Sequence, residues 1–275
     1  MASDPVLLAE DLSYAYGASK GGAGEGGFTV SLPRLELEEG AVTALTGVSG
    51  SGKSTLLECL GLLRPVERAG IFRAAGRDML GLSRREQHLM RSSLMGFMPQ
   101  QGGLIPFLTV GGNLEAAFDL ACASMQKAGI RPPKRQEAIG EARAMCQSLG
   151  IDGLLSRYPR ELSIGQAQRA SFVRATVHSP RILFVDEPTS ALDPPRALEL
   201  FEKMASLVSG KGLAALVVTH DTTLASRCGF RRCAYNAALS TADRSVFTYE
   251  DGADANSADE ADGAQGSGAD GRLEQ

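Results

Sequence analysis

The stretch Gly47-Val48-Ser49-Gly50-Ser51-Gly52-Lys53-Ser54 decides the fold that we expect for this chain. Its pattern, G-x-x-x-x-G-K-[ST], is typical of a phosphate-binding loop between a strand and a helix. The apolar residues 41–46 before it predict a buried strand, and residues 54–60 after it predict a helix. A Gly-rich turn with an unrelated lysine is the alternative, which this strand-loop-helix context disfavours.

Phosphate binding requires these residue types at this spacing. Glycines let the backbone curl so that its N–H groups face the phosphates, and the N-terminus of the following helix adds positive potential. We expect Lys53 to reach the β- and γ-phosphates, and the Ser54 hydroxyl to ligate Mg²⁺. The other predicted nucleotide contacts of this stretch are Gly47, Ser49, Gly50, Ser51, Gly52 and Thr55.

The composition limits the class of protein. The chain has 275 residues, of which 43% are hydrophobic, enough for one large domain or two modest ones. No apolar run reaches the roughly 18 residues of a membrane span, and we expect no signal peptide. The five cysteines are scattered, which favours reduced cytosolic thiols, and the spacing of Cys228 and Cys233 near His220 matches no zinc pattern.

The net charge of −4 is unevenly distributed. Residues 251–275 contain seven acidic residues and one basic residue in a Gly/Ala/Asp/Ser-rich segment, which predicts a disordered acidic tail. The acidic balance therefore describes the tail, and it argues neither for nor against a nucleic-acid partner of the folded part.

Strand and helix patterns alternate along the rest of the chain. The predicted strands are residues 6–16, 28–37, 94–98, 181–185 and 213–219, with small terminal strands within 232–249. The predicted helices are residues 110–128, 136–149, 163–178 and 197–208. This alternation predicts an α/β fold with a parallel sheet covered on both faces. Residues 104–162 are predicted to be a helical insertion, and the Gly-rich residues 17–27 a flexible loop.

Two adjacent acids end one of the buried strands. Asp186 can hold Mg²⁺, and Glu187 is then placed to polarise an attacking water molecule. An acidic turn after a strand is the alternative. Upstream, Ser163 is a good N-cap and Gln166 completes a capping box, so this stretch begins a helix whose N-terminus is also an anion site.

Together these motifs resemble the ATPase subunit of an ABC transporter. The resemblance spans roughly residues 6–250 and rests on motifs in a fixed order, which are Gly47–Thr55, Gln100 after a strand, Leu162–Gln166 with Gln168-Arg169, Asp186-Glu187-Pro188-Thr189-Ser190, Ser190-Ala191-Leu192-Asp193, and His220 after a strand. It implies a P-loop NTPase fold with a mainly parallel core sheet, an N-terminal antiparallel β subdomain and a helical subdomain at about residues 104–162. It also implies ATP and Mg²⁺ as ligands, within one ATPase domain over residues 1–250.

The resemblance implies roles for residues on this chain's own nucleotide. Tyr16 resembles the aromatic residue that stacks on adenine, with Tyr14 as a rival. Gln100 resembles the glutamine that senses Mg²⁺ and water and couples to the membrane partner. His220 resembles the switch histidine that contacts the γ-phosphate, beside the proposed base Glu187.

Other residues resemble those that act across a dimer. Ser163, Gly165 and Gln166 resemble signature residues that meet the nucleotide held by the opposite subunit, and Asp193 resembles a residue that communicates between subunits. Ile164 departs from the family, which usually has glycine there, and we expect function to survive because its two neighbours are intact. Pro99 is a second departure, which we expect to stiffen the loop before Gln100.

The function implied is an ATP-hydrolysing subunit that drives a separate membrane protein when two copies, or two homologous subunits, close around ATP. We expect an integral membrane permease as partner, no nucleic acid, and a cytoplasmic location on the inner face of the membrane. Residues 59–65 and 104–114 look most like the lipoprotein-releasing, macrolide-export and cell-division branch. The alternatives are a soluble ABC ATPase of repair, translation or cell division, and a non-hydrolysing module, which would be expected to lack the two acids.

Overall fold

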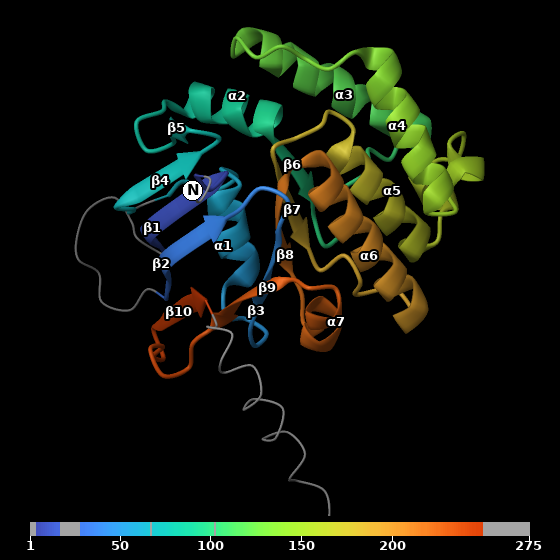
Figure 1. Ribbon diagram of the computed structural model, residues 1–275. Helices are drawn as coiled ribbons and strands as arrows, with labels where there is room; N and C mark the ends of the chain where they lie inside the picture. The colour runs from blue at the N-terminus through green and yellow to red at the C-terminus, as the bar shows by residue number, and fades with distance from the viewer. Residues whose placement is uncertain (1–3, 17–27, 67, 102, 250–275) are drawn as a thin grey trace, which may run out of the picture.

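Five parallel strands form the core of the computed structural model, which describes residues 4–16, 28–66, 68–101 and 103–249. They lie in the order β9 (Arg231–Tyr235), β3 (Val42–Thr46), β8 (Ala214–Val218), β7 (Ile182–Asp186) and β6 (Met95–Met98) (Figure 1). Every residue of β3, β7 and β8 is buried, because helices cover both faces of this half of the sheet. The predicted parallel core is therefore confirmed.

Alternate residues of each strand feed two hydrophobic cores. Leu183 and Val185 of β7 belong to a core shared with α5 (Ile164–Thr176), α6 (Pro194–Lys211) and α7 (Thr222–Arg227). Ile182 and Phe184 of the same strand belong to the opposite core, which includes α1 (Lys53–Leu60). Since side chains of a strand alternate in direction, both faces of the sheet are held by apolar contacts.

The N-terminal strands form an antiparallel extension of the same sheet. Its order is β5 (Arg77–Asp78), β4 (Ile71–Ala74), β1 (Leu7–Ala15) and β2 (Thr29–Leu37). β10 (Arg244–Tyr249) joins the halves, because it pairs parallel to β2 and antiparallel to β9. The antiparallel β subdomain is confirmed, whereas the loop predicted at 17–27 and the tail predicted at 251–275 lie outside the described residues.

Residues 71–94 hold structure that our sequence analysis did not predict. β4 and β5 form a hairpin, and α2 (Arg84–Leu94) follows them. The helix begins with a capping box, in which the Ser83 side chain accepts from the N–H of Glu86 while the carboxylate of Glu86 accepts from the N–H of Ser83. That S-x-x-E spacing was a usable signal. Leu94, which we expected in the next strand, is the last residue of α2.

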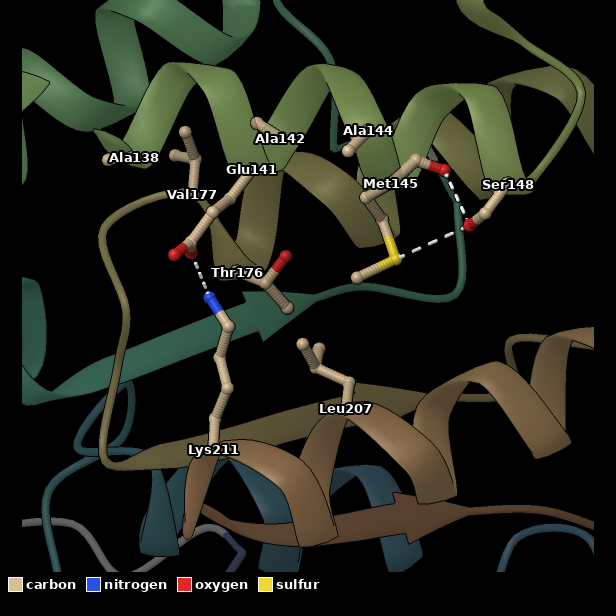
Figure 2. A pocket seen from close by; sticks show the side chains of 10 residues that line it. All are labelled: Ala138, Glu141, Ala142, Ala144, Met145, Ser148, Thr176, Val177, Leu207 and Lys211. Atoms are coloured by element: carbon tan, nitrogen blue, oxygen red, sulfur yellow. Dashed lines mark hydrogen bonds and ion pairs between the residues drawn. The ribbon is translucent and has the colours of Figure 1, made fainter. Parts of the chain in front are cut away.

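The helices α3 (Val110–Lys127) and α4 (Arg135–Ser148) lie to one side of the sheet, with two 3₁₀ helices (Asp152–Leu154 and Pro159–Glu161) (Figure 1). They fall within the predicted helical subdomain at 104–162, and α5 packs against both α3 and α4. A cavity of about 270 Å³ lies between α4 and α6. An ion pair of Lys211 with Glu141 bridges the two helices there (Figure 2). Among the described residues, no helix combines the length and the apolar character that crossing a membrane requires.

A buried histidine beyond α5 predicts a pH dependence of folding. His178 Nε2 lies 3.2 Å from the carbonyl oxygen of Met95, and burial lowers the pKa of His178 to about 4. The unfolded imidazole, with a pKa of about 6.5, takes up a proton before the folded one does. Stability should therefore fall between pH 6.5 and 4, by roughly 1.4 kcal/mol per pH unit and about 3 kcal/mol in all.

The measurement is chemical denaturation of wild type and His178→Gln at pH 7 and pH 5. The loss of stability on acidification should be smaller in His178→Gln by about 1–2 kcal/mol. His88→Gln, which changes an exposed histidine of α2, is the control and should keep the wild-type pH dependence. Equal pH dependence in all three proteins would contradict the assignment.

Candidate nucleotide-binding and catalytic site

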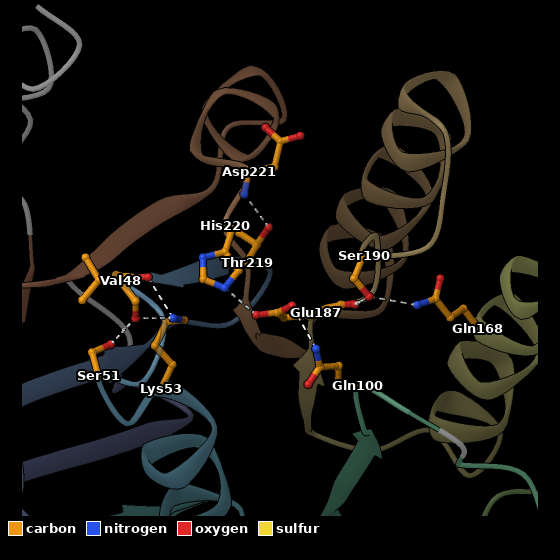
Figure 3. A network of polar contacts seen from close by, with 11 residues as sticks. Val48, Ser51, Lys53, Gln100, Gln168, Glu187, Ser190, Thr219, His220 and Asp221 are labelled. Atoms are coloured by element: carbon orange, nitrogen blue, oxygen red, sulfur yellow. Dashed lines mark hydrogen bonds and ion pairs between the residues drawn. The ribbon is translucent and has the colours of Figure 1, made fainter. Parts of the chain in front are cut away.

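Four motifs that are far apart in the sequence meet at one edge of the parallel sheet (Figure 3). The loop at 47–52 follows β3, His220 follows β8, Glu187 follows β7, and Gln100 follows β6. These four strands are neighbours, in the order β3, β8, β7 and β6. Ligands of open α/β sheets bind at the carboxyl ends of such strands.

The loop after β3 can be made only by glycine at two positions. A Cβ on Gly52, whose φ is 94°, would lie 2.4 Å from Cγ2 of Val30. A Cβ on Gly47 would lie 2.6 Å from the Cβ of Tyr235. The loop is thus pressed against β2 and β9 while it turns into the N-terminus of α1.

Lys53 reaches back into this loop. Its Nζ donates to the carbonyl oxygens of Gly47 (2.8 Å) and Val48 (2.9 Å) (Figure 3). Burial lowers the pKa of the Lys53 ammonium, and the negative charges of Glu187 and Asp186 oppose that shift. Among the described residues, Lys53 Nζ has only these two carbonyl oxygens as hydrogen-bond partners. A partly desolvated cation of this kind at a helix N-terminus favours an anionic ligand.

The first acid, Asp186, lies beside the Ser54 hydroxyl. Burial raises the pKa of Asp186, while a hydrogen bond with Ser54 opposes the shift. Its Oδ1 is buried and makes no hydrogen bond to any described residue. A carboxylate with an unshared oxygen next to a hydroxyl is a hard-oxygen donor set of the kind that Mg²⁺ prefers, so these residues fit the predicted ion.

The second acid, Glu187, is held at both carboxylate oxygens. Gln100 Nε2 donates to Oε2 (3.1 Å), and His220 Nε2 lies 2.7 Å from Oε1 (Figure 3). The Glu187 side chain is 18% exposed, so it borders solvent rather than the core. Gln100, also a predicted metal ligand, thus directs its amide nitrogen to the second acid in this structure.

The structure distinguishes the two candidate stacking residues. Tyr16 is 37% exposed, and its hydroxyl forms a hydrogen bond with Oγ1 of Thr55, just after the phosphate loop. The Tyr14 and Tyr16 rings pack in a T-shaped arrangement with centroids 5.3 Å apart, and the Arg64 guanidinium lies over the Tyr14 ring, 5.6 Å from its centroid. Tyr16 is therefore the residue with ring surface available beside the loop.

The predicted signature residues occupy the start of α5. Ser163 caps the helix by accepting from the N–H of Gln166 (3.2 Å), and Gln166 Oε1 accepts from the N–H of Ser163 (2.8 Å), so the capping box is confirmed. Ile164 is 71% exposed, so its side chain needs no space inside the protein. A Cβ on Gly165 would lie 2.7 Å from Cδ2 of Leu192, so a larger residue there would have to displace the end of that side chain.

The structure does not bring every predicted residue into one site. Among the described residues, no hydrogen bond joins Ser163, Gly165 or Gln166 to the phosphate loop or to Glu187. Asp193 caps α6 by accepting from the N–H of Arg196 (3.1 Å). Ser163 and Asp193 thus act as helix caps, and among the described residues they take no part in the contacts that join Gln100, Glu187 and His220.

Sequence reasoning assigned no role to two residues that support Glu187. Ser190 Oγ donates to the backbone carbonyl oxygen of Glu187 (3.0 Å), and Gln168 Nε2 donates to Ser190 Oγ (3.3 Å). Both belong to quoted motifs, but no pattern in the sequence pairs a helix residue with the loop after β7.

A buried lysine inside a glycine loop and two acids at the end of another strand of the same sheet serve one chemistry, which is the binding and hydrolysis of a nucleoside triphosphate. The fold and the site together define a P-loop nucleoside triphosphatase. His220, Cys228 and Cys233 add no metal centre to it, because no group of three or more His, Cys, Asp or Glu in the described part of the chain is arranged to hold a metal ion.

Comparison with known proteins places the chain within this class. The family model described as "ABC transporter" matches residues 31–190. The lipoprotein-releasing system ATP-binding protein LolD of Ruegeria pomeroyi is 38% identical over 199 residues, covering 70% of this chain and 80% of that protein. LolD 2 of Caulobacter vibrioides is 34% identical over 228 residues, covering 81% and 91%. The chain belongs to the ABC transporter family, as one of its ATP-binding and ATP-hydrolysing subunits.

The structural comparison agrees with this assignment. The bacterial ABC transporter cassette MJ0796 superposes with a TM-score of 0.68 at 26% identity, covering 83% of this chain and 93% of that one. MJ0796 has been solved as a dimer, and also in a post-hydrolysis state bound to ADP and Pi. The resemblance inferred from the motifs is therefore confirmed.

Proposed function

We propose that this chain powers a separate integral membrane permease, and that two copies, or this chain and a homologous subunit, close around two ATP molecules. The observation that carries the proposal is that the site is divided. Lys53 and Glu187 follow strands of the parallel sheet, whereas Ser163 and Gly165 stand at the start of α5, and no hydrogen bond joins them to the phosphate loop among the described residues. A second subunit would supply the missing half, in keeping with the dimer of MJ0796.

The residues at the sheet edge have complementary tasks in this proposal. Lys53 binds the β- and γ-phosphates, together with the N–H groups of Gly47, Ser49, Gly50, Ser51, Gly52 and Thr55. Tyr16 stacks on adenine. Ser54 and Asp186, with Gln100, would hold Mg²⁺, which supplies Lewis-acid stabilisation of the phosphate charge when bound.

Glu187 acts as the general base. It accepts a proton from water as the water oxygen bonds to the γ-phosphorus, while the bond to the β–γ bridging oxygen breaks and ADP leaves. Gln100 and His220 aim the carboxylate through the contacts at its two oxygens. In this proposal His220 also contacts the γ-phosphate.

The second subunit would contribute the start of α5. Ser163, Gly165 and Gln166 would meet the γ-phosphate held by the first copy, because the N-terminus of a 13-residue helix attracts anions. Asp193, at the start of α6, would carry contacts between the copies. Binding energy from ATP then drives closure, and hydrolysis reopens the pair.

The membrane partner would contact the helical subdomain, for which we propose the range of about 104–162 within a domain of residues 1–250. This places the chain in the cytoplasm, at the inner face of the membrane. Phe107 lies in this range and is 76% exposed, so its side chain is accessible to such a partner. The LolD relatives favour a partner of the lipoprotein-releasing type, with no nucleic acid involved.

Solubilised membranes containing the tagged chain provide the test. We expect a polytopic membrane protein to copurify in fixed ratio, and Phe107→Asp to reduce its recovery at least tenfold without lowering the ATPase rate of the purified chain. Leu239→Asp is the matched control, because Leu239 is 55% exposed in the turn between β9 and β10. Absence of a membrane protein, or equal loss with both variants, would contradict the proposal.

A further inference from the structure

Two hydrogen bonds tie α5 to the loop after β7. Gln168 Nε2 donates to Ser190 Oγ (3.3 Å), and Ser190 Oγ donates to the backbone carbonyl oxygen of Glu187 (3.0 Å) (Figure 3). The backbone N–H of Ser190 reaches the same carbonyl oxygen at 3.3 Å. Gln168 is only 6% exposed whereas Ser190 is exposed, so the link runs from the buried side of α5 to the surface of the loop after β7.

The backbone of Glu187 needs such support because its conformation is strained. Its φ of 46° lies in the left-handed region, which costs a residue other than glycine about 1–2 kcal/mol. The N–H of Glu187 is fixed by the carbonyl oxygen of Val218 (3.0 Å). Among the described residues, the carbonyl oxygen of Glu187 accepts only from the backbone N–H and the hydroxyl of Ser190, so the Ser190 side chain supplies one of the two hydrogen bonds that hold it.

The Gln168 amide decides where the Ser190 hydroxyl points. A hydroxyl has one hydrogen to donate, and an N–H donated to its oxygen leaves that hydrogen for the Glu187 carbonyl. An apolar side chain at position 168 would fill the same space but would let the hydroxyl rotate. Gln168 Oε1 is buried without a hydrogen bond to any described residue, which is a cost to stability that packing alone would not favour.

We propose that Gln168 is a positioning residue for ATP hydrolysis, which acts through Ser190 to keep the Glu187 carboxylate aimed at the attacking water. The inference rests on the proposed role of Glu187 as the general base. Gln168 would also connect Glu187 to the start of α5, since Gln168 lies on the helix whose start would bind the nucleotide of the second subunit. A second contact reinforces this connection, because Gly165 packs against Leu192 in the same loop.

Gln168→Met tests the inference in the full chain, since methionine has a similar length and no hydrogen-bonding amide. We expect kcat to fall about tenfold, equivalent to about 1.4 kcal/mol, while the Kd for ATP changes less than twofold. Ser190→Ala should lower kcat to a similar extent. Because the two residues act in series, the double variant should be no slower than the slower single variant.

A control variant separates positioning from general destabilisation. Cys146→Ala opens space in the buried core of α4, and it should lower Tm without lowering kcat well below Tm. A Gln168→Met protein with lower Tm but wild-type kcat, or a double variant whose losses multiply, would overturn the inference. Glu187→Gln is assayed in parallel. If it turns over normally, both the proposed base and the inference fail; if it is inactive while Gln168→Met is not impaired, only the inference fails.

Discussion

Replacing Glu187 with glutamine is expected to lower the rate of ATP hydrolysis at least a hundredfold while ATP still binds. General bases contribute roughly 10²- to 10⁴-fold to enzymatic rates, and an amide cannot accept the proton of the attacking water. Glutamine has the same shape, so the contacts at 3.1 Å to Gln100 and 2.7 Å to His220 can largely persist. Steady-state phosphate release and equilibrium binding of ATP measure the two quantities separately.

The same variant should accumulate as an ATP-bound dimer, since reopening is proposed to require hydrolysis. Size-exclusion chromatography with ATP and Mg²⁺ should show the dimer, and addition of a chelator during loading should abolish it. Glu202→Gln makes the same chemical change at an exposed position of α6 and serves as the control. Turnover of Glu187→Gln at the wild-type rate would exclude Glu187 as the base.

Much of the fold could be predicted because buried parallel strands have short, continuous apolar sequences. Residues 182–185 and 214–218 are uniformly apolar, and both strands are buried on both faces of the sheet. The hairpin β4–β5 has no such apolar run, since its two strands have four and two residues and both residues of β5 are exposed. The start of α2 is predictable from the S-x-x-E spacing of Ser83 and Glu86, which forms a capping box.

The residues of the site likewise fall into a group that could be predicted from the sequence and a group that could not. Lys53, Asp186, Glu187, Gln100 and His220 follow strands, and the topology of a parallel sheet brings strand ends together without any knowledge of packing. The link from α5 to the loop after β7 depends instead on how the helix packs against its neighbours, which short-range sequence patterns do not predict. The sequence already favoured Tyr16 over Tyr14, but the contact of Tyr16 with Thr55 depends on side-chain positions that the sequence does not give.

Lys53→Ala is expected to weaken ATP binding by at least about thirtyfold. Removing one member of a buried, hydrogen-bonded charge pair costs roughly 2–5 kcal/mol, and Lys53 is proposed to form such a pair with the ATP phosphates. Among the described residues, its ammonium donates only to two carbonyl oxygens of the loop, so no carboxylate bonded to it competes with the phosphates. Titration of the monomer with ATP, at protein concentrations too low for dimers, gives the affinity. Lys203→Ala, on α6, is the matched control and should bind as wild type does.

Ser163→Arg should have the opposite profile, because Ser163 is proposed to act on the nucleotide of the other subunit. Monomer affinity for ATP should stay within about twofold, since no hydrogen bond joins Ser163 to the phosphate loop among the described residues, whereas dimer formation in a Glu187→Gln background should be lost. Ser163→Ala removes the helix cap alone, at a cost of about 1 kcal/mol in stability, and so separates a weakened α5 from a blocked interface. If Lys53→Ala and Ser163→Arg reduced monomer binding equally, the start of α5 would belong to this chain's own site, and a site shared between two subunits would be excluded.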